Sequence, residues 1–234
     1  MILSREQMID AEKMAFASGV EPATLMESAG RQMAGFVIQN HPRPGQCRVY
    51  AGKGHNGGDV LVAARHLVSA GWSIETVLPE PSLAPLTEAQ RRRLGEGSPA
   101  GEKYPDVILD GLLGIGARGN PREPVAAAIR EINRLRKNSA SWVLAADLPS
   151  GLDAETGEPG DPCVEADATM AVGFVKSGLV ADAAVNFVGR LAVASLDGLQ
   201  PPQVNVPDES SLAVGSELLR HCLPPRAFDT HKGM

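Results

Sequence analysis

From residue 47 onward, short apolar runs alternate with helix-like segments, and this alternation constrains the fold more than any other feature of the sequence. The runs expected to form strands are 47–52, 73–79, 106–110, 142–147, 166–174 and 189–197. The segments expected to form helices between them are 58–71, 86–95 and 123–138. Short buried strands that alternate with helices are typical of βαβ units. We therefore expect an α/β fold with a mostly parallel central sheet that is covered on both faces.

Two further helices are expected before the first of these strands. Ser4 and Gln7 have the spacing of a capping box, and apolar residues follow at helical intervals until Gly19. Pro22 suits the first turn of a second helix, which the stretch 41–46 should end because it contains two prolines and a glycine.

Composition argues against several classes of protein. A formal net charge of −6 over 234 residues does not suit a general binder of nucleic acid or of membrane surfaces. The basic cluster 91–93 is expected to be a solvated helix face. Cys47, Cys163 and Cys222 have neither a disulfide-framework nor a zinc-site spacing, so we expect a reducing, cytoplasmic setting.

Ligands of open α/β sheets bind beyond the carboxyl ends of the strands, and three loops at such positions carry unusual residues. The loops are 52–59, 110–120 and 147–153. The first has four glycines, which permit close backbone approach to a ligand, and Asn56 is a candidate cap of the helix that follows. It lacks the Lys-Ser/Thr ending of a phosphate-binding Walker loop, and a purely structural turn is the alternative.

The second loop contains the spacing Gly-x-Gly-x-x-Gly over residues 114–119, which resembles a dinucleotide-binding fingerprint. Pro121 and Pro124 argue against that interpretation, because they keep a helix from starting directly at the glycines. A flexible crossover is the alternative there. In the third loop, Asp147 ends a strand and Asp153 is expected to cap or brace the turn, so a structural role is again the alternative.

Asn56, Asp110 and Ser150 place one short oxygen-bearing side chain in each loop. Such a mostly neutral set suits a hard monovalent cation better than zinc. Asp59 and Asp147 remain available for ligand binding or proton transfer. Because these acids repel phosphate, a phosphate group would have to bind glycine-loop amides, with help from Arg118.

Five motifs in order resemble the YjeF N-terminal domain family, the NAD(P)H-hydrate epimerases. They occupy residues 25–30, 52–67, 110–119, 147–157 and 173–179, and the resemblance covers residues 1 to about 215. It implies a Rossmann-like three-layer αβα sandwich, a homodimer, and interconversion of the R and S forms of hydrated NADH and NADPH at C6 of the nicotinamide. A fused or separate ADP- or ATP-dependent dehydratase would then restore the cofactor.

The resemblance also implies roles for individual residues. Asn56, Asp110 and Ser150 would hold one potassium ion per subunit. The hydrate would contact His55, Asn56, Gly57, Gly58, Asp59, Gly114, Ile115, Gly116, Ala117, Arg118, Gly119, Asn120 and Asp147. We assign the acid–base role to Asp147, with Lys176 as a lesser candidate, since Asp147 is the carboxylate at the pocket that is not assigned to potassium. Both loss of the hydroxyl through an iminium and ring opening with reclosure stay open as routes.

The chain departs from the family pattern at His55 and Val60, where asparagine and glycine are usual, and at Ser177, within a motif that is often Lys-Pro-Gly. The histidine at position 55 introduces a type of side chain that ordinarily titrates near neutrality. Residues 216–234 are expected to be a linker and the start of a missing dehydratase domain. Two alternatives to an epimerase stay open, namely a non-catalytic scaffold of the same fold and a nicotinamide dehydrogenase.

Overall fold

The computed structural model describes residues 1–95 and 104–201, and its centre is a six-stranded sheet in which every neighbouring pair of strands is parallel. The strand order is β3-β2-β4-β5-β6-β8. Their bounds are β2 (Gln46–Ala51), β3 (Ser73–Val77), β4 (Val107–Gly111), β5 (Trp142–Ala146), β6 (Ala168–Val172) and β8 (Arg190–Ala194). All six coincide with the predicted apolar runs, which confirms the predicted α/β class.

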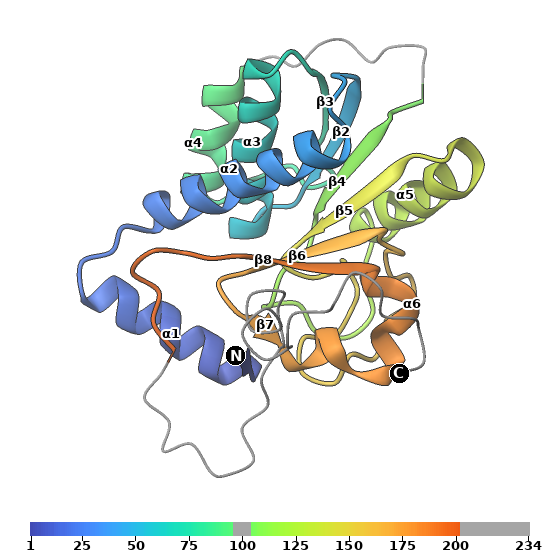
Figure 1. Cartoon of the computed structure of the whole chain (residues 1–234). Coiled ribbons are helices and arrows are strands. Elements are labelled where there is room, and N and C mark those ends of the chain that lie inside the picture. Colours follow the sequence, from blue (N-terminus) through green and yellow to red (C-terminus); the bar gives the residue numbers. More distant parts are fainter. Residues whose placement is uncertain (96–103, 202–234) are drawn as a thin grey trace, which may run out of the picture.

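Helices cover both faces of this sheet (Figure 1). On one face α2 (Pro22–Asn40) packs with α3 (His55–Ser69), and α4 (Pro85–Leu94) packs against α3. On the other face lies α5 (Val125–Ser139). On α4, Arg91 and Arg92 pair with Glu88 at the surface, as expected of a solvated helix face. The three-layer arrangement is therefore confirmed.

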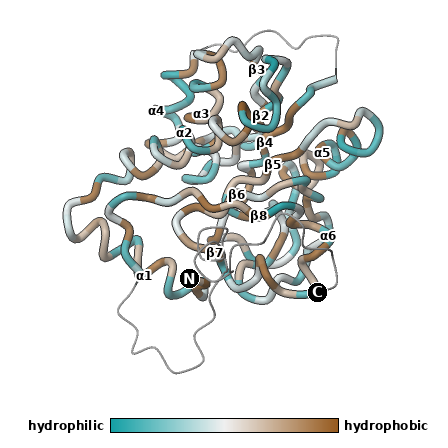
Figure 2. The backbone as a smooth tube through the Cα atoms, viewed as in Figure 1, coloured by the Kyte–Doolittle hydropathy of each residue, from teal (hydrophilic) through white to brown (hydrophobic). Residues whose placement is uncertain are grey.

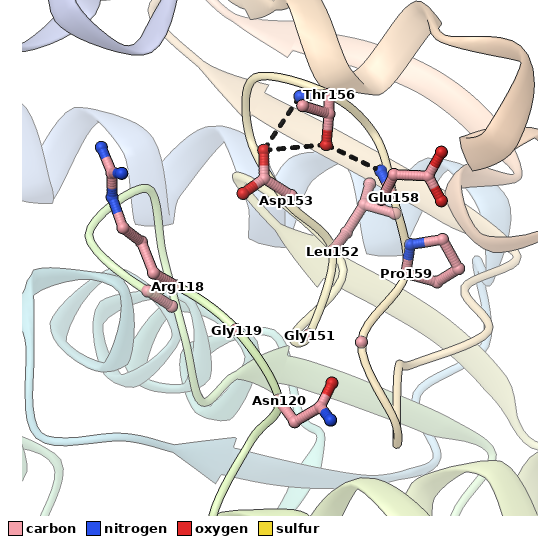
Figure 3. Close-up of a pocket in the computed structure, with 11 residues that line it drawn as sticks. Arg118, Gly119, Asn120, Gly151, Leu152, Asp153, Thr156, Glu158 and Pro159 are labelled. Atoms are coloured by element: carbon pink, nitrogen blue, oxygen red, sulfur yellow. Dashed lines mark hydrogen bonds between the residues drawn. The ribbon is translucent and has the colours of Figure 1, made fainter.

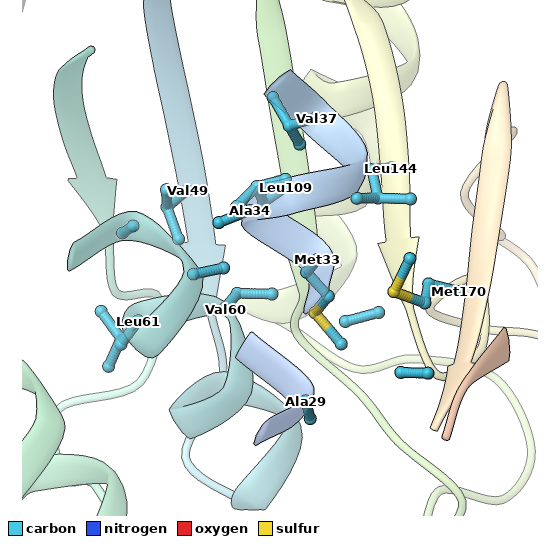
Figure 4. Packing of buried hydrophobic residues seen from close by; sticks show 14 of the residues in the cluster. Ala29, Met33, Ala34, Val37, Val49, Val60, Leu61, Leu109, Leu144 and Met170 are labelled. Carbon is cyan, nitrogen blue, oxygen red and sulfur yellow. The ribbon is translucent and has the colours of Figure 1, made fainter. Parts of the chain in front are cut away.

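Alternate residues of each central strand enter different cores. In β4, Leu109 packs toward α2 and α3 while Ile108 packs toward α5, and in β5 the residues Leu144 and Val143 divide in the same way. Figure 4 shows the first of these cores, where Met33 of α2 lies between residues of the sheet and of α3. Strands buried on both faces are apolar at successive positions, as in residues 107–109 of β4 and along β5 (Figure 2), because neither face meets water.

A second, smaller sheet places the first helix near the carboxyl ends of the central strands. β1 (Ile2–Leu3) pairs in parallel with β7 (Val175–Lys176), so that Leu3 lies opposite Lys176. α1 (Arg5–Ala17) follows β1 directly, and its predicted capping box is confirmed by reciprocal hydrogen bonds between Ser4 and Gln7. This pairing determines where α1 lies, and it was not predicted from the sequence.

The chain after β7 forms short helical turns before it returns to the sheet edge as β8. They are η1 (Ser177–Val180), η2 (Asp182–Ala184) and α6 (Val185–Val188). Within the described part of the chain, no helix has the length and apolar character needed to cross a membrane. The predicted linker at 216–234, the domain boundary at 215 and Cys222 lie outside the described residues.

Candidate active site

A cavity of about 530 Å³ lies at the carboxyl ends of the central strands. Its walls are formed by α1, the start of α3, the loops after β2, β3 and β4, the residue after β5 and the end of β6, and Lys176 of β7 completes the lining. The structure thus brings together many of the residues predicted to bind substrate or to act on it. Those that line this cavity are His55, Asn56, Asp59, Gly114, Ile115, Gly116, Ala117, Asp147 and Lys176.

The rest of the predicted substrate loop lines a second cavity of about 200 Å³, which shares only Ala117 with the first. Arg118, Gly119 and Asn120 form one side of it, and the segment 151–160 forms the other (Figure 3). Asp153 braces that segment by accepting hydrogen bonds from the backbone N–H groups of Glu155 and Thr156, both at 2.9 Å. The bracing role predicted for Asp153 is confirmed.

The glycine-rich stretch 52–59 is mostly helix rather than loop. α3 begins at His55 with Gly54 as its N-cap, so the prediction that Asn56 caps this helix was wrong. Asn56 instead lies in the first turn, where its side chain is buried. Gly57 and Gly58 line neither of these two cavities. Both are closely packed, since a Cβ at Gly57 would meet the carbonyl of Gly52 and one at Gly58 would meet Met26.

Asp110 and Ser150 form a fully buried pair next to the large cavity. The Ser150 hydroxyl and backbone N–H donate to the two carboxylate oxygens of Asp110 at 2.6 and 2.8 Å, and the N–H of Leu112 donates at 3.2 Å. Burial raises the pKa of Asp110 to about 6, although these hydrogen bonds act to lower it. A carboxylate in this position needs compensating charge.

Asn56 supplies a free oxygen to the same region. Its Nδ2 donates to the carbonyl of Leu113 at 2.8 Å, while the N–H of Leu113 donates to the Ser150 hydroxyl at 2.9 Å. The Oδ1 atom of Asn56 is buried and has no hydrogen-bond partner. A buried polar atom without a partner is costly, and a bound cation would satisfy it. Among the described residues there is no cluster of three or more His, Cys, Asp or Glu that could hold a metal ion, so zinc-type ligation has no support there.

Asp147 and Lys176 form a buried ion pair at the cavity. Asp147 has a positive φ of 64°, a conformation that non-glycine residues adopt rarely, and it follows directly after β5. The Lys176 ammonium donates to Asp147 and also to the carbonyl of Val172 at 2.8 Å, while the N–H of Val172 donates to Asp147 at 3.1 Å. Backbone and ion pair together orient this carboxylate.

Glu12 of α1, which was not among the residues predicted from the sequence, also lines the cavity. Burial, and then the charge of Asp147, raises the pKa of Glu12. Burial and the charges of Asp147 and Glu12 likewise raise the pKa of Asp59 well above its usual value. Glu12 is four residues after the buried Met8, so the two side chains share a helix face. A carboxyl group on the apolar face of an amphipathic helix was the one signal that could have identified it.

Comparison with known proteins shows a consistent set of similarities. The family model described as YjeF-related protein N-terminus matches residues 22–178. A bifunctional NAD(P)H-hydrate repair enzyme Nnr of Hyperthermus butylicus is 36% identical over 230 residues, which cover 92% of this chain and 40% of that protein. An NAD(P)H-hydrate epimerase of Cenarchaeum symbiosum is 36% identical over 191 residues, which cover 76% of this chain and 88% of that protein.

The fold has a counterpart among solved structures. The crystal structure of the yeast protein ynu0 (YNL200c) matches with a TM-score of 0.67 at 22% sequence identity. The match covers 76% of this chain and 82% of the yeast chain. At that identity the likeness concerns the fold alone. This chain spans less than half of the length of the bifunctional relatives from Hyperthermus butylicus and Gloeobacter violaceus, 40% and 38% respectively.

Proposed function

This chain belongs to the family of YjeF-related N-terminal domains, and on that premise we propose that it epimerises hydrated NADH and NADPH. The reaction interconverts the R and S forms at C6 of the nicotinamide ring and is a metabolite-repair reaction. The similarity to an NAD(P)H-hydrate epimerase that this chain nearly spans supports the proposal. In the structure itself, the observation that carries it is the oriented Asp147–Lys176 pair in the lining of the large cavity.

The proposed chemistry needs proton transfer without a change in oxidation state. C6 bears both the hydroxyl group and the ring nitrogen, so the nitrogen lone pair can assist departure of the hydroxyl. A positioned carboxylate is then needed to take a proton from the water that returns to C6. Asp147 suits this role because its ion pair with Lys176 orients its side chain at the cavity wall.

We also propose that Asn56, Asp110 and Ser150 hold a potassium ion. The unpartnered Oδ1 of Asn56 and the buried carboxylate of Asp110 support this assignment, since both need a cation to offset their burial. When bound, potassium supplies a fixed positive charge beside the cavity. The side chains of this site brace the loop after β4 through Leu113, which lines the cavity.

Potassium is expected to stabilise the folded chain, and Asn56→Ala is expected to abolish that effect. A ligand at about ten times its Kd adds about 1.4 kcal/mol, which raises Tm by about 3 to 5 °C in a chain of this size. The measurement is thermal unfolding in potassium chloride against sodium chloride at equal ionic strength. Asn133→Ala is the matched control, because Asn133 also donates at 2.8 Å to a backbone carbonyl, that of Cys163, away from this site. An equal response of both variants to potassium would contradict the assignment.

A dehydratase is the proposed functional partner. The relatives named bifunctional repair enzymes support a fused second activity in longer proteins of this family. A homodimer is proposed on the family resemblance, and a cytoplasmic setting on the spacing of the cysteines. Sedimentation of the purified chain tests the dimer.

The direct test of the proposed function is epimer exchange. Purified R-NADHX is incubated with the chain and potassium, and the S form is followed by chromatography against a reaction without enzyme. Acceleration with no change in nicotinamide oxidation state is expected. A folded chain that binds the nucleotide without accelerating exchange would instead be a non-catalytic scaffold, and a change in oxidation state would indicate a dehydrogenase.

A further inference from the structure

The large cavity has walls from two separate parts of the fold. Asp59 and Asp147 come from the edge of the central sheet, one in the first turns of α3 and the other directly after β5. Glu12 comes from α1, which the β1–β7 pairing holds in place and which lies below the layer of α2, α3 and α4 in Figure 1. A ligand in the cavity therefore meets a carboxyl group from each wall.

The cavity lining contains more carboxyl groups than paired cationic side chains. Its ionisable lining residues are Glu12, Lys53, His55, Asp59, Glu80, Asp147 and Lys176. Lys53 pairs with Glu80 at 3.2 Å, and Lys176 pairs with Asp147. Within residues 1–95 and 104–201, Glu12 and Asp59 have no ion-pair or hydrogen-bond partner for their carboxyl groups. Burial and the nearby charge of Asp147 disfavour the ionised form of both carboxyl groups and raise the pKa of Glu12 and of Asp59.

Epimerisation of one carbon by loss of its hydroxyl and addition of water needs proton transfer on both faces of the ring. A hydroxyl that leaves from one face must be protonated there, and water that adds to the other face must lose a proton there. One carboxyl group cannot reach both faces of a bound ring, and Asp59 shares the sheet-edge wall with Asp147. Glu12 is the carboxyl group that α1, a separate element, brings to the lining.

We propose that Glu12 is the second catalytic acid–base group of this cavity, acting from α1, whereas Asp147 acts from the end of the central sheet. This inference rests on the proposed epimerase function. Glu12 donates its proton to the C6 hydroxyl, the C6–O bond breaks with its electron pair on oxygen, and the nitrogen lone pair forms the C6–N double bond. Water then adds to C6 from the other face and gives a proton to Asp147. One water leaves and one enters, and the reverse epimerisation begins with Asp147 protonated and Glu12 ionised.

The test compares Glu12→Gln with Glu6→Gln. Glutamine has nearly the shape of a protonated glutamic acid, so it preserves packing but cannot supply the proton. Glu6 is on the same helix, exposed, and outside the lining. We expect Glu12→Gln to lower kcat by about 10²-fold, the lower end of the usual range for acid–base catalysis, with unchanged Tm, and Glu6→Gln to keep the wild-type kcat. Glu12→Asp should recover part of the rate.

Exchange in ¹⁸O-labelled water is the second measurement. Every molecule of S product formed in the first turnover should contain one solvent oxygen, because the proposed step breaks the C6–O bond. A product that keeps its original oxygen, or a Glu12→Gln variant with wild-type kcat, would overturn the role of Glu12 while the epimerase function stands. A wild-type chain without exchange activity would overturn the proposed function and this role together.

Discussion

Asp147→Asn is expected to lower the kcat for epimerisation by about 10²–10⁴-fold, the range typical of losing a positioned acid–base group. The amide keeps an oxygen that can accept from Lys176 and from the N–H of Val172, so the geometry around it is preserved. It cannot take up a proton from water. The measurement is the rate of S-epimer formation per folded protein, and binding of the hydrate should change much less than kcat.

This variant also leaves Lys176 buried without its counter-ion, which can cost about 3–5 kcal/mol of stability. Thermal unfolding of each preparation therefore accompanies the kinetics, and Asp147→Asn combined with Lys176→Gln removes both charges at once. Asp197→Asn is the matched control, since Asp197 is exposed and lies outside the large cavity. If the folded double variant, or Asp147→Asn itself, epimerised at the wild-type rate, Asp147 would not be the acid–base group.

Gly57→Ala is expected to destabilise the fold by about 3 kcal/mol or more, the upper end of overpacking effects. A Cβ at this position would overlap the backbone carbonyl oxygen of Gly52, and backbone cannot move aside as the end of a flexible side chain can. The close approach holds the start of α3 against the end of β2, where Asn56 and Asp59 enter the site. Chemical denaturation of the variant and the wild type measures the difference.

Gly35→Ala in α2 is the control, because this substitution is not expected to lower the free energy of unfolding. Both glycines are in helices, but a Cβ at Gly35 meets no atom within 4 Å. Alanine is the better helix former by about 0.8–1.0 kcal/mol, so Gly35→Ala should leave stability unchanged or raise it. Similar free energies of unfolding for the two variants would show that the packing at Gly57 does not hold α3 in place.

The sheet could be predicted because its signal is local. Residues such as Ile108 and Leu109 are apolar in succession since they face two different cores, and that run is visible in the sequence without knowledge of its neighbours. The sequence also predicted that Asn56, Asp110 and Ser150 lie near one another, because the carboxyl ends of parallel strands meet at one edge of the sheet. The residue at which α3 begins could not be predicted from the sequence. A glycine-rich stretch is typical of a loop, and the close contact between Gly57 and Gly52 in the first turn of the helix leaves no pattern in the sequence.

The sequence by itself therefore determined the α/β class, the strands and the three polar strand ends, since periodicity and turn residues encode local structure. Only the tertiary structure decided that Lys176 pairs with Asp147 and that Glu12 reaches the same cavity. Both depend on the pairing of β1 with β7, and each of these strands is only two residues long, which is too short to leave a periodic signal. Long-range contacts of this kind arise from packing of the whole fold, so a local pattern can mark Glu12 as unusual on its helix face but cannot place it at the cavity.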